Sequence, residues 1–90
     1  MDEVERELVL ALAPGQPVAL ARIVEGPGKG NWLLVWPAGH TKGDLGQARL
    51  NQRAALYAEQ LFDRVPRPAQ RSFDVDGRRV TVTFELHRLE

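Results

Sequence analysis

Apolar and polar positions follow a helical period at the start of the chain. Over residues 2–13, apolar side chains recur every three or four positions, which is the spacing of one helix face. Acidic residues begin this segment and suit the positive end of a helix, with Asp2 as the expected N-terminal cap. Pro14 and Gly15 interrupt the pattern. We therefore expect a first helix over 2–13.

Two apolar segments follow, 17–26 and 31–36, with the glycine-rich turn 27–31 between them. Their composition predicts two strands paired as a hairpin. Side chains in the second segment alternate between two faces, and both faces are apolar, with Trp32 and Trp36 on the same one. Such a strand is either covered on both sides or contacts a partner.

The clearest helix pattern lies at 45–65. Asp44 precedes it as the expected N-cap, Gln47 completes a capping-box pattern, and Pro66 ends it. One stripe of the helix is apolar, and its members are Leu50, Ala54, Tyr57, Ala58, Leu61, Phe62 and Val65.

The C-terminal part alternates with the period of two that is typical of strands. Asp76 and Gly77 predict a two-residue type I′ turn between two paired strands, with Val75 opposite Arg78 and Phe73 opposite Val80. The opposite face of this hairpin is polar. The face expected in the core carries Phe73, Val75, Val80, Val82, Phe84 and Leu86.

These elements predict one small α+β domain over residues 1–90, in the order α-β-β-α-β-β. We expect a largely antiparallel sheet with the two helices on one of its faces.

Composition narrows the function classes. Twelve basic and twelve acidic residues give a formal net charge of zero, so we do not expect nucleic acid as a partner, and an arginine-driven anion binder is a third-ranked alternative. The chain has no cysteine, which excludes disulfides and thiolate chemistry. No apolar run is long enough for a membrane span, and the acidic start is unlike a signal peptide. We expect a cytoplasmic protein with no membrane association.

No catalytic constellation is visible. The one serine, Ser72, lies in a predicted strand without the glycines of a nucleophile elbow. His40 and His87 are the only histidines, and their surroundings lack metal-ligand spacing. We therefore expect no catalytic residues, no metal site and a protein that is not an enzyme.

The segment GHTKGDLG, residues 39–46, leads into the second predicted helix and supports two interpretations. Backbone N–H groups at a helix start can bind an anion, with a lysine adding charge. Alternatively the segment is a turn and a cap, in which the aspartate carboxylate occupies those same donors. The candidate ligand-binding residues are Gly39, His40, Lys42, Gly43, Asp44 and Gly46.

A family resemblance extends over residues 15–62, GQPVALARIVEGPGKGNWLLVWPAGHTKGDLGQARLNQRAALYAEQLF. This stretch resembles the N-terminal domain of the XdhC/CoxI family, accessory proteins in the maturation of xanthine dehydrogenase and carbon monoxide dehydrogenase. The matching features are a Gly-x-Pro-hydrophobic-Ala-Leu-Ala strand from Gly15 to Ala21, the turn glycines Gly39 and Gly43, and an Ala- and Leu-rich helix. The closing segment VTVTFELHRLE also looks like the strand that ends that domain.

The chain departs from the family pattern at one functional motif. Family members carry a Gly-Gly-Cys followed by an acidic residue, whereas residues 44–48 here read DLGQA. The resemblance implies binding of molybdenum cofactor and a molybdoenzyme partner of the xanthine or CO dehydrogenase type. Cysteine-dependent sulfur handling does not transfer to this chain.

The sequence thus predicts a non-catalytic, stand-alone XdhC/CoxI-like accessory domain. The alternative is a small homo-oligomeric protein-interaction domain without a small-molecule ligand, associating through the strand that carries Trp32 and Trp36. In both interpretations we expect a homo-oligomer.

Overall fold

The computed structural model describes residues 3–11, 16–62 and 69–87. Several predictions concern residues outside these ranges. They are the helix cap at Asp2, the helix ends at Pro14, Gly15 and Pro66, and the core position of Val65. The described elements run in the order α1 (Glu3–Ala11), β1 (Val18–Glu25), β2 (Trp32–Val35), β3 (Thr41–Gly43), α2 (Ala48–Leu61), β4 (Ala69–Val75) and β5 (Arg78–His87).

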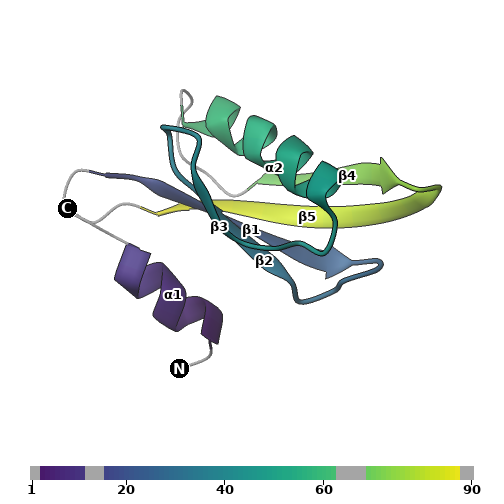
Figure 1. The fold of residues 1–90 in the computed structure, drawn as a ribbon, viewed down its shortest axis with the longest axis horizontal. Coiled ribbons are helices and arrows are strands. Elements are labelled where there is room, and N and C mark those ends of the chain that lie inside the picture. The colour runs from purple at the N-terminus through teal and green to yellow at the C-terminus, as the bar shows by residue number, and fades with distance from the viewer. Residues whose placement is uncertain (1–2, 12–15, 63–68, 88–90) are drawn as a thin grey trace.

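All five strands form one antiparallel sheet in the order β3-β2-β1-β5-β4 (Figure 1). The α+β class and the β1–β2 hairpin are confirmed. The strand β3 was not predicted, because a three-residue polar segment with a glycine has no strand pattern of its own. It becomes a strand through pairing with β2, where Thr41 lies opposite Val35 and Gly43 opposite Leu33.

The predicted C-terminal hairpin is confirmed in turn and register. Asp76 and Gly77 have φ values of 51° and 78°, as a type I′ turn requires. Val75 lies opposite Arg78, and Phe73 opposite Val80. Five of the six expected core residues are buried, and Leu86 is partly buried against them.

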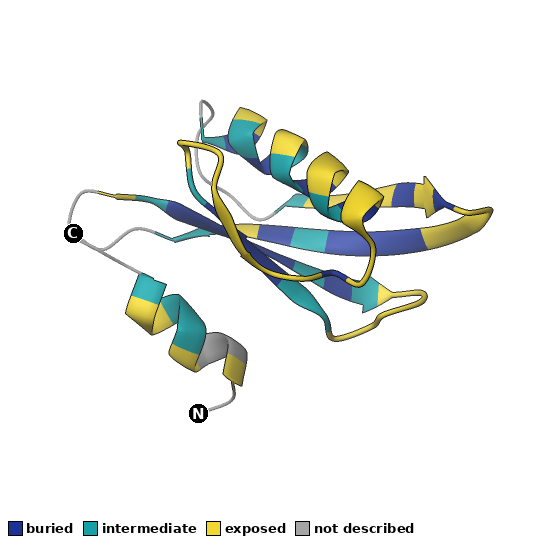
Figure 2. Cartoon of the chain, in the orientation of Figure 1, coloured by how far each residue is buried: buried dark blue, intermediate teal, exposed yellow. Residues whose placement is uncertain are grey.

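The larger core lies between α2 and one face of the sheet. Figure 2 shows the inner side of α2 and much of β1 and β5 buried, while the outer side of α2 is exposed. The predicted stripe of α2 packs on this face, with Leu50, Ala54, Ala58 and Leu61 buried and Tyr57 and Phe62 partly buried.

The other face of the sheet carries α1 rather than being left open. A second cluster joins Val18, Leu20 and Leu34 of the sheet to Leu8 and Ala11 of α1. The expectation that both helices share one face is therefore not met (Figure 1). The physical reason is that β1 and β2 are apolar on both faces, so each face needs its own cover.

This arrangement changes the expected role of the two tryptophans. Trp32 and Trp36 are partly buried and pack beside the α1 cluster. The apolar face that suggested self-association thus packs in part against α1 within the chain. Neither α1 nor α2, the helices in the described ranges, has the length and apolar character needed to cross a membrane.

Candidate functional site

The candidate segment begins in the turn between β2 and β3. The Gly39 N–H donates to the Trp36 carbonyl at 2.9 Å, and the Trp36 N–H donates to the His40 carbonyl at 3.1 Å. The imidazole of His40 stacks on the Trp36 indole, with ring centroids 4.5 Å apart and planes 13° from parallel. His40 therefore packs on the turn that leads into β3.

Gly43 ends β3 in close contact with Trp32. Its φ of +108° favours glycine, and a Cβ there would lie 2.6 Å from the Trp32 carbonyl oxygen and 3.0 Å from the indole ring. The glycine thus allows the β3 backbone to lie flat against Trp32. This packing explains Gly43 without a ligand.

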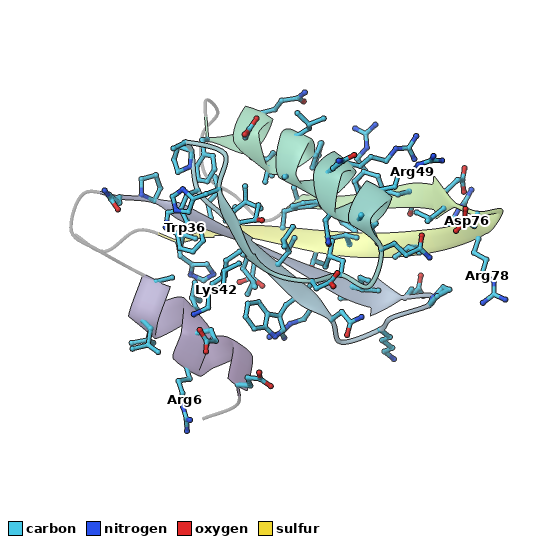
Figure 3. All side chains as sticks on the ribbon, viewed as in Figure 1. Arg6, Trp36, Lys42, Arg49, Asp76 and Arg78 are labelled. Atoms are coloured by element: carbon cyan, nitrogen blue, oxygen red, sulfur yellow. The ribbon has the colours of Figure 1, made fainter. Side chains whose placement is uncertain are left out.

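Lys42 links β3 to α1. Its side chain lies on the α1 side of the sheet (Figure 3), and the ammonium pairs with the Glu7 carboxylate at 2.6 Å. The Lys42 side chain is 57% exposed and that of Glu7 23%. The one cation of the candidate loop therefore already has an anionic partner in the same chain.

Asp44 does not cap α2, contrary to the prediction from sequence. The helix begins at Ala48, and its N-cap, Gln47, makes no side-chain capping hydrogen bond. The start is delayed because Leu45 must turn into the core, where it is 1% exposed. Gly46 then adopts a φ of +110°, which a helix cannot contain. The capping-box interpretation of Gln47 fails for the same reason.

Asp44 instead organises the turn before the helix. Its Oδ1 accepts hydrogen bonds from the Gly46 N–H at 2.8 Å and from the Asn51 side-chain amide at 2.9 Å. Both bonds favour the ionised carboxylate, so they lower the pKa of Asp44, with the Asn51 bond contributing most. The carboxylate occupies a donor that an anionic ligand would need.

Two asparagines complete this turn, and no pattern in the sequence predicted either role. Asn51 Oδ1 accepts from the Leu45 N–H at 2.8 Å, and Asn31 Nδ2 donates to the Leu45 carbonyl at 3.1 Å. Asn31 precedes β2, and Asn51 lies in the first turn of α2. Because their partners lie 14 and 6 positions away, only tertiary packing identifies them.

The loop is therefore fixed from within the chain. The amides of Asp44, Leu45 and Gly46 donate to the Trp32 carbonyl, Asn51 and Asp44, respectively. Within the described ranges, no group of three histidine, aspartate or glutamate side chains is placed to hold a metal ion. The arrangement suits a rigid scaffold better than a cradle with free donors.

The chain matches no model of a known protein family, no curated protein and no solved structure. Its function is accordingly inferred from its own residues and from the resemblance described above.

Proposed function

We propose that this chain is a non-catalytic accessory domain that acts by binding another protein. The observation that carries the proposal is the internal pairing of the 39–46 loop. Three consecutive amides, of residues 44, 45 and 46, and the Lys42 ammonium already have partners within the chain. A small anionic ligand would have to displace Asp44 and Glu7, whereas a protein surface can dock on a rigid loop without breaking these contacts.

The proposed partner is a molybdoenzyme of the xanthine or CO dehydrogenase type. This choice rests on the resemblance of residues 15–62 to the XdhC/CoxI N-terminal domain. The segment that carries the resemblance contains β1, β2, β3 and α2. We assign the domain no step of cofactor chemistry, because the chain has no cysteine and its loop donors are already engaged.

Mixing experiments distinguish protein docking from cofactor binding. Isothermal titration with a purified cofactor-free molybdoenzyme of the xanthine dehydrogenase type is expected to give a stoichiometric complex. Titration with phosphate, a nucleotide and molybdopterin, followed through the Gly43 and Gly46 amides by NMR, is expected to leave both amides unchanged at millimolar concentration.

Lysine variants provide the matched control. The chain has two lysines, Lys42 in the loop and Lys29 in the β1–β2 turn. If a ligand moves the loop amides, and Lys42→Ala weakens its binding by about 1–3 kcal/mol while Lys29→Ala does not, the loop is a ligand site. That result would overturn the choice of a protein over a small molecule.

Self-association is the second candidate, and one observation favours it. Val9 and Leu10 on α1 are 58% and 71% exposed, so adjacent apolar side chains face away from the sheet. We propose that any homo-oligomer forms through this surface of α1 rather than through Trp32 and Trp36. Light scattering at increasing concentration is expected to show a dimer that Leu10→Asp dissociates. A monomer at millimolar concentration would exclude it.

A further inference from the structure

The strand β4 forms one edge of the sheet, and every second residue along it directs its backbone hydrogen-bonding groups outward. Val75 and Arg78 flank the two-residue turn and are therefore a hydrogen-bonded pair. Because such pairs alternate along an antiparallel ladder, Gln70, Ser72 and Asp74 direct their N–H and C=O groups away from β5. In the described part of the chain β4 is the last strand of the sheet, so these groups face outward.

A contact with α2 independently supports this orientation. The Asp74 carbonyl accepts a hydrogen bond from Arg53 Nη1 at 3.1 Å, so it points toward the helix side of the edge and not into the β4–β5 ladder. An arginine of α2 thus already binds one of the outward backbone groups. The other outward groups, those of Gln70 and Ser72 and the Asp74 N–H, are positioned to form hydrogen bonds with an extended chain.

A groove of about 450 Å³ runs between this edge and α2. From the helix it is lined by Arg53, Leu56, Tyr57 and Gln60, and from β4 by Arg71, Ser72, Phe73 and Asp74. The helix residues at 53, 56 and 60 share one face by their spacing. Leu56 is 61% exposed, so its apolar side chain is accessible from the groove.

The groove lining carries a small excess of positive charge, with Arg53 and Arg71 against Asp74. The Arg71 guanidinium lies over the rings of Tyr57 and Phe73, 5.0 Å and 5.7 Å from their centroids. Within the described ranges neither Arg53 nor Arg71 pairs with a carboxylate. Because its aromatic contacts order Arg71 without neutralising it, its guanidinium is available to bind a carboxylate.

We propose that this groove binds an extended acidic peptide segment of a partner protein, which adds to β4 as a sixth strand. The strand has seven residues, so it can pair with a segment of about seven residues, roughly 23 Å long. Alternate side chains of the segment face α2, where carboxylates meet Arg53 and Arg71 and an apolar side chain meets Leu56. The proposal rests on the proposed function, since it names where a protein partner docks.

Charge argues for a partner protein rather than a second copy at this edge. Two β4 strands that pair antiparallel about Ser72 bring the two Arg71 side chains to the same face, as diagonal neighbours. Their like charges repel, and the Arg53 side chains add to the repulsion. An acidic segment meets the same surface with opposite charge.

Three synthetic peptides test the proposal on the intact chain. The first, TETFTET, places glutamate and phenylalanine on one face of a strand, and the second replaces both glutamates with lysine. The third is TETFTET with N-methyl groups on the alternate amides that would face β4. We expect binding of the first, at least tenfold weaker binding of the second, and none of the third. The first peptide should also slow hydrogen exchange at the Gln70, Ser72 and Asp74 amides.

Variants assign the contact to the groove. Arg71→Gln and Leu56→Ala are each expected to weaken binding of TETFTET about fivefold to tenfold. If Arg71→Gln disturbs the fold because its aromatic contacts are lost, Leu56→Ala still tests the groove, because Leu56 is exposed. Arg6→Gln, which removes the same charge from α1 on the other face of the sheet, is expected to have no effect (Figure 3).

Several outcomes would overturn the proposal. Two of these are equal binding of the acidic and lysine peptides and binding that survives N-methylation. A third is protection of the β4 amides that rises with protein concentration in the absence of peptide, which would identify a second copy as the occupant. If no peptide binds while the molybdoenzyme complex forms, the groove assignment fails and the proposed function stands. If neither binds, both fail.

Discussion

The two edges of the sheet differ in length and in what lies beside them. The β3 edge has three residues, and the segment around it is fixed by the His40–Trp36 stack, the Lys42–Glu7 pair and the Asp44 turn. The β4 edge has seven residues, and an arginine-lined groove runs beside it.

This difference indicates which edge is suited to pairing with another chain. Short edge strands with local obstacles discourage pairing with another chain, whereas a long open edge invites it. The glycines and the lysine of the 39–46 loop are typical of a ligand site, yet in the structure they hold the loop in place. The β4 edge has no motif, and its binding capacity follows from its place in the sheet.

The largest effect is expected from removing the core beneath the β4 edge. Phe84 is fully buried and makes edge contacts with Tyr57 and Phe73, which line the groove. We expect Phe84→Ala to lower the free energy of unfolding by about 3–5 kcal/mol in a denaturant titration. Leu56→Ala, at an exposed position, should change it by less than about 0.5 kcal/mol. A loss below about 1 kcal/mol for Phe84→Ala would show that this residue is not in the core.

The second largest loss of stability is expected at Gly43, where β3 packs closely on Trp32. Gly43 and Gly30 both have φ near +100°, but a Cβ meets Trp32 only at Gly43 and finds nothing within 4 Å at Gly30. We expect Gly30→Ala to cost about 1 kcal/mol from backbone strain, and Gly43→Ala about 2–4 kcal/mol from strain and overlap together. Equal losses in thermal or denaturant unfolding would mean that the Trp32 contact does not constrain β3.

A smaller effect is expected from the turn that replaces the predicted helix cap. Asn51 both accepts from the Leu45 amide and donates to Asp44, so Asn51→Ala removes two hydrogen bonds and should cost about 1–2 kcal/mol. Gln52→Ala, its exposed neighbour on α2, serves as the control and should be nearly neutral. If the two variants are equally stable, the turn contributes nothing to holding the loop.

The smallest effect concerns pH. Hydrogen bonds from Asn51 and the Gly46 amide lower the pKa of Asp44 in the folded chain. The ionised carboxylate therefore stabilises the fold above the ordinary pKa of aspartate, and this contribution is lost as pH falls through the lowered folded value. We expect NMR titration to place the pKa of Asp44 below that ordinary value, and Asn51→Ala to raise it. A pKa that Asn51→Ala leaves unchanged would contradict the assignment.

Local patterns in the sequence were enough to predict most of the regular structure. The β4–β5 hairpin was predicted down to its register, because Asp76-Gly77 and strict alternation act over adjacent residues. The β1–β2 hairpin followed from the apolar composition of its two segments and the glycine-rich turn between them, and the buried stripe of α2 followed from periodicity. The two apolar faces of β2 were also evident, and with them the requirement for cover on both sides or for a partner.

Tertiary structure alone decided what covers each face and which groups are left to bind. Whether α1 packs beside α2 or opposite it depends on which face of the sheet is still uncovered, and no local pattern encodes this. Pairing with β2 makes β3 a strand. Burial of Leu45 in the core shifts the start of α2, so Asp44 forms a turn with Asn51 instead of capping the helix. The edge position of β4 likewise follows only from the strand order, because hydrogen-bonding capacity at an edge depends on which neighbours the assembled sheet lacks.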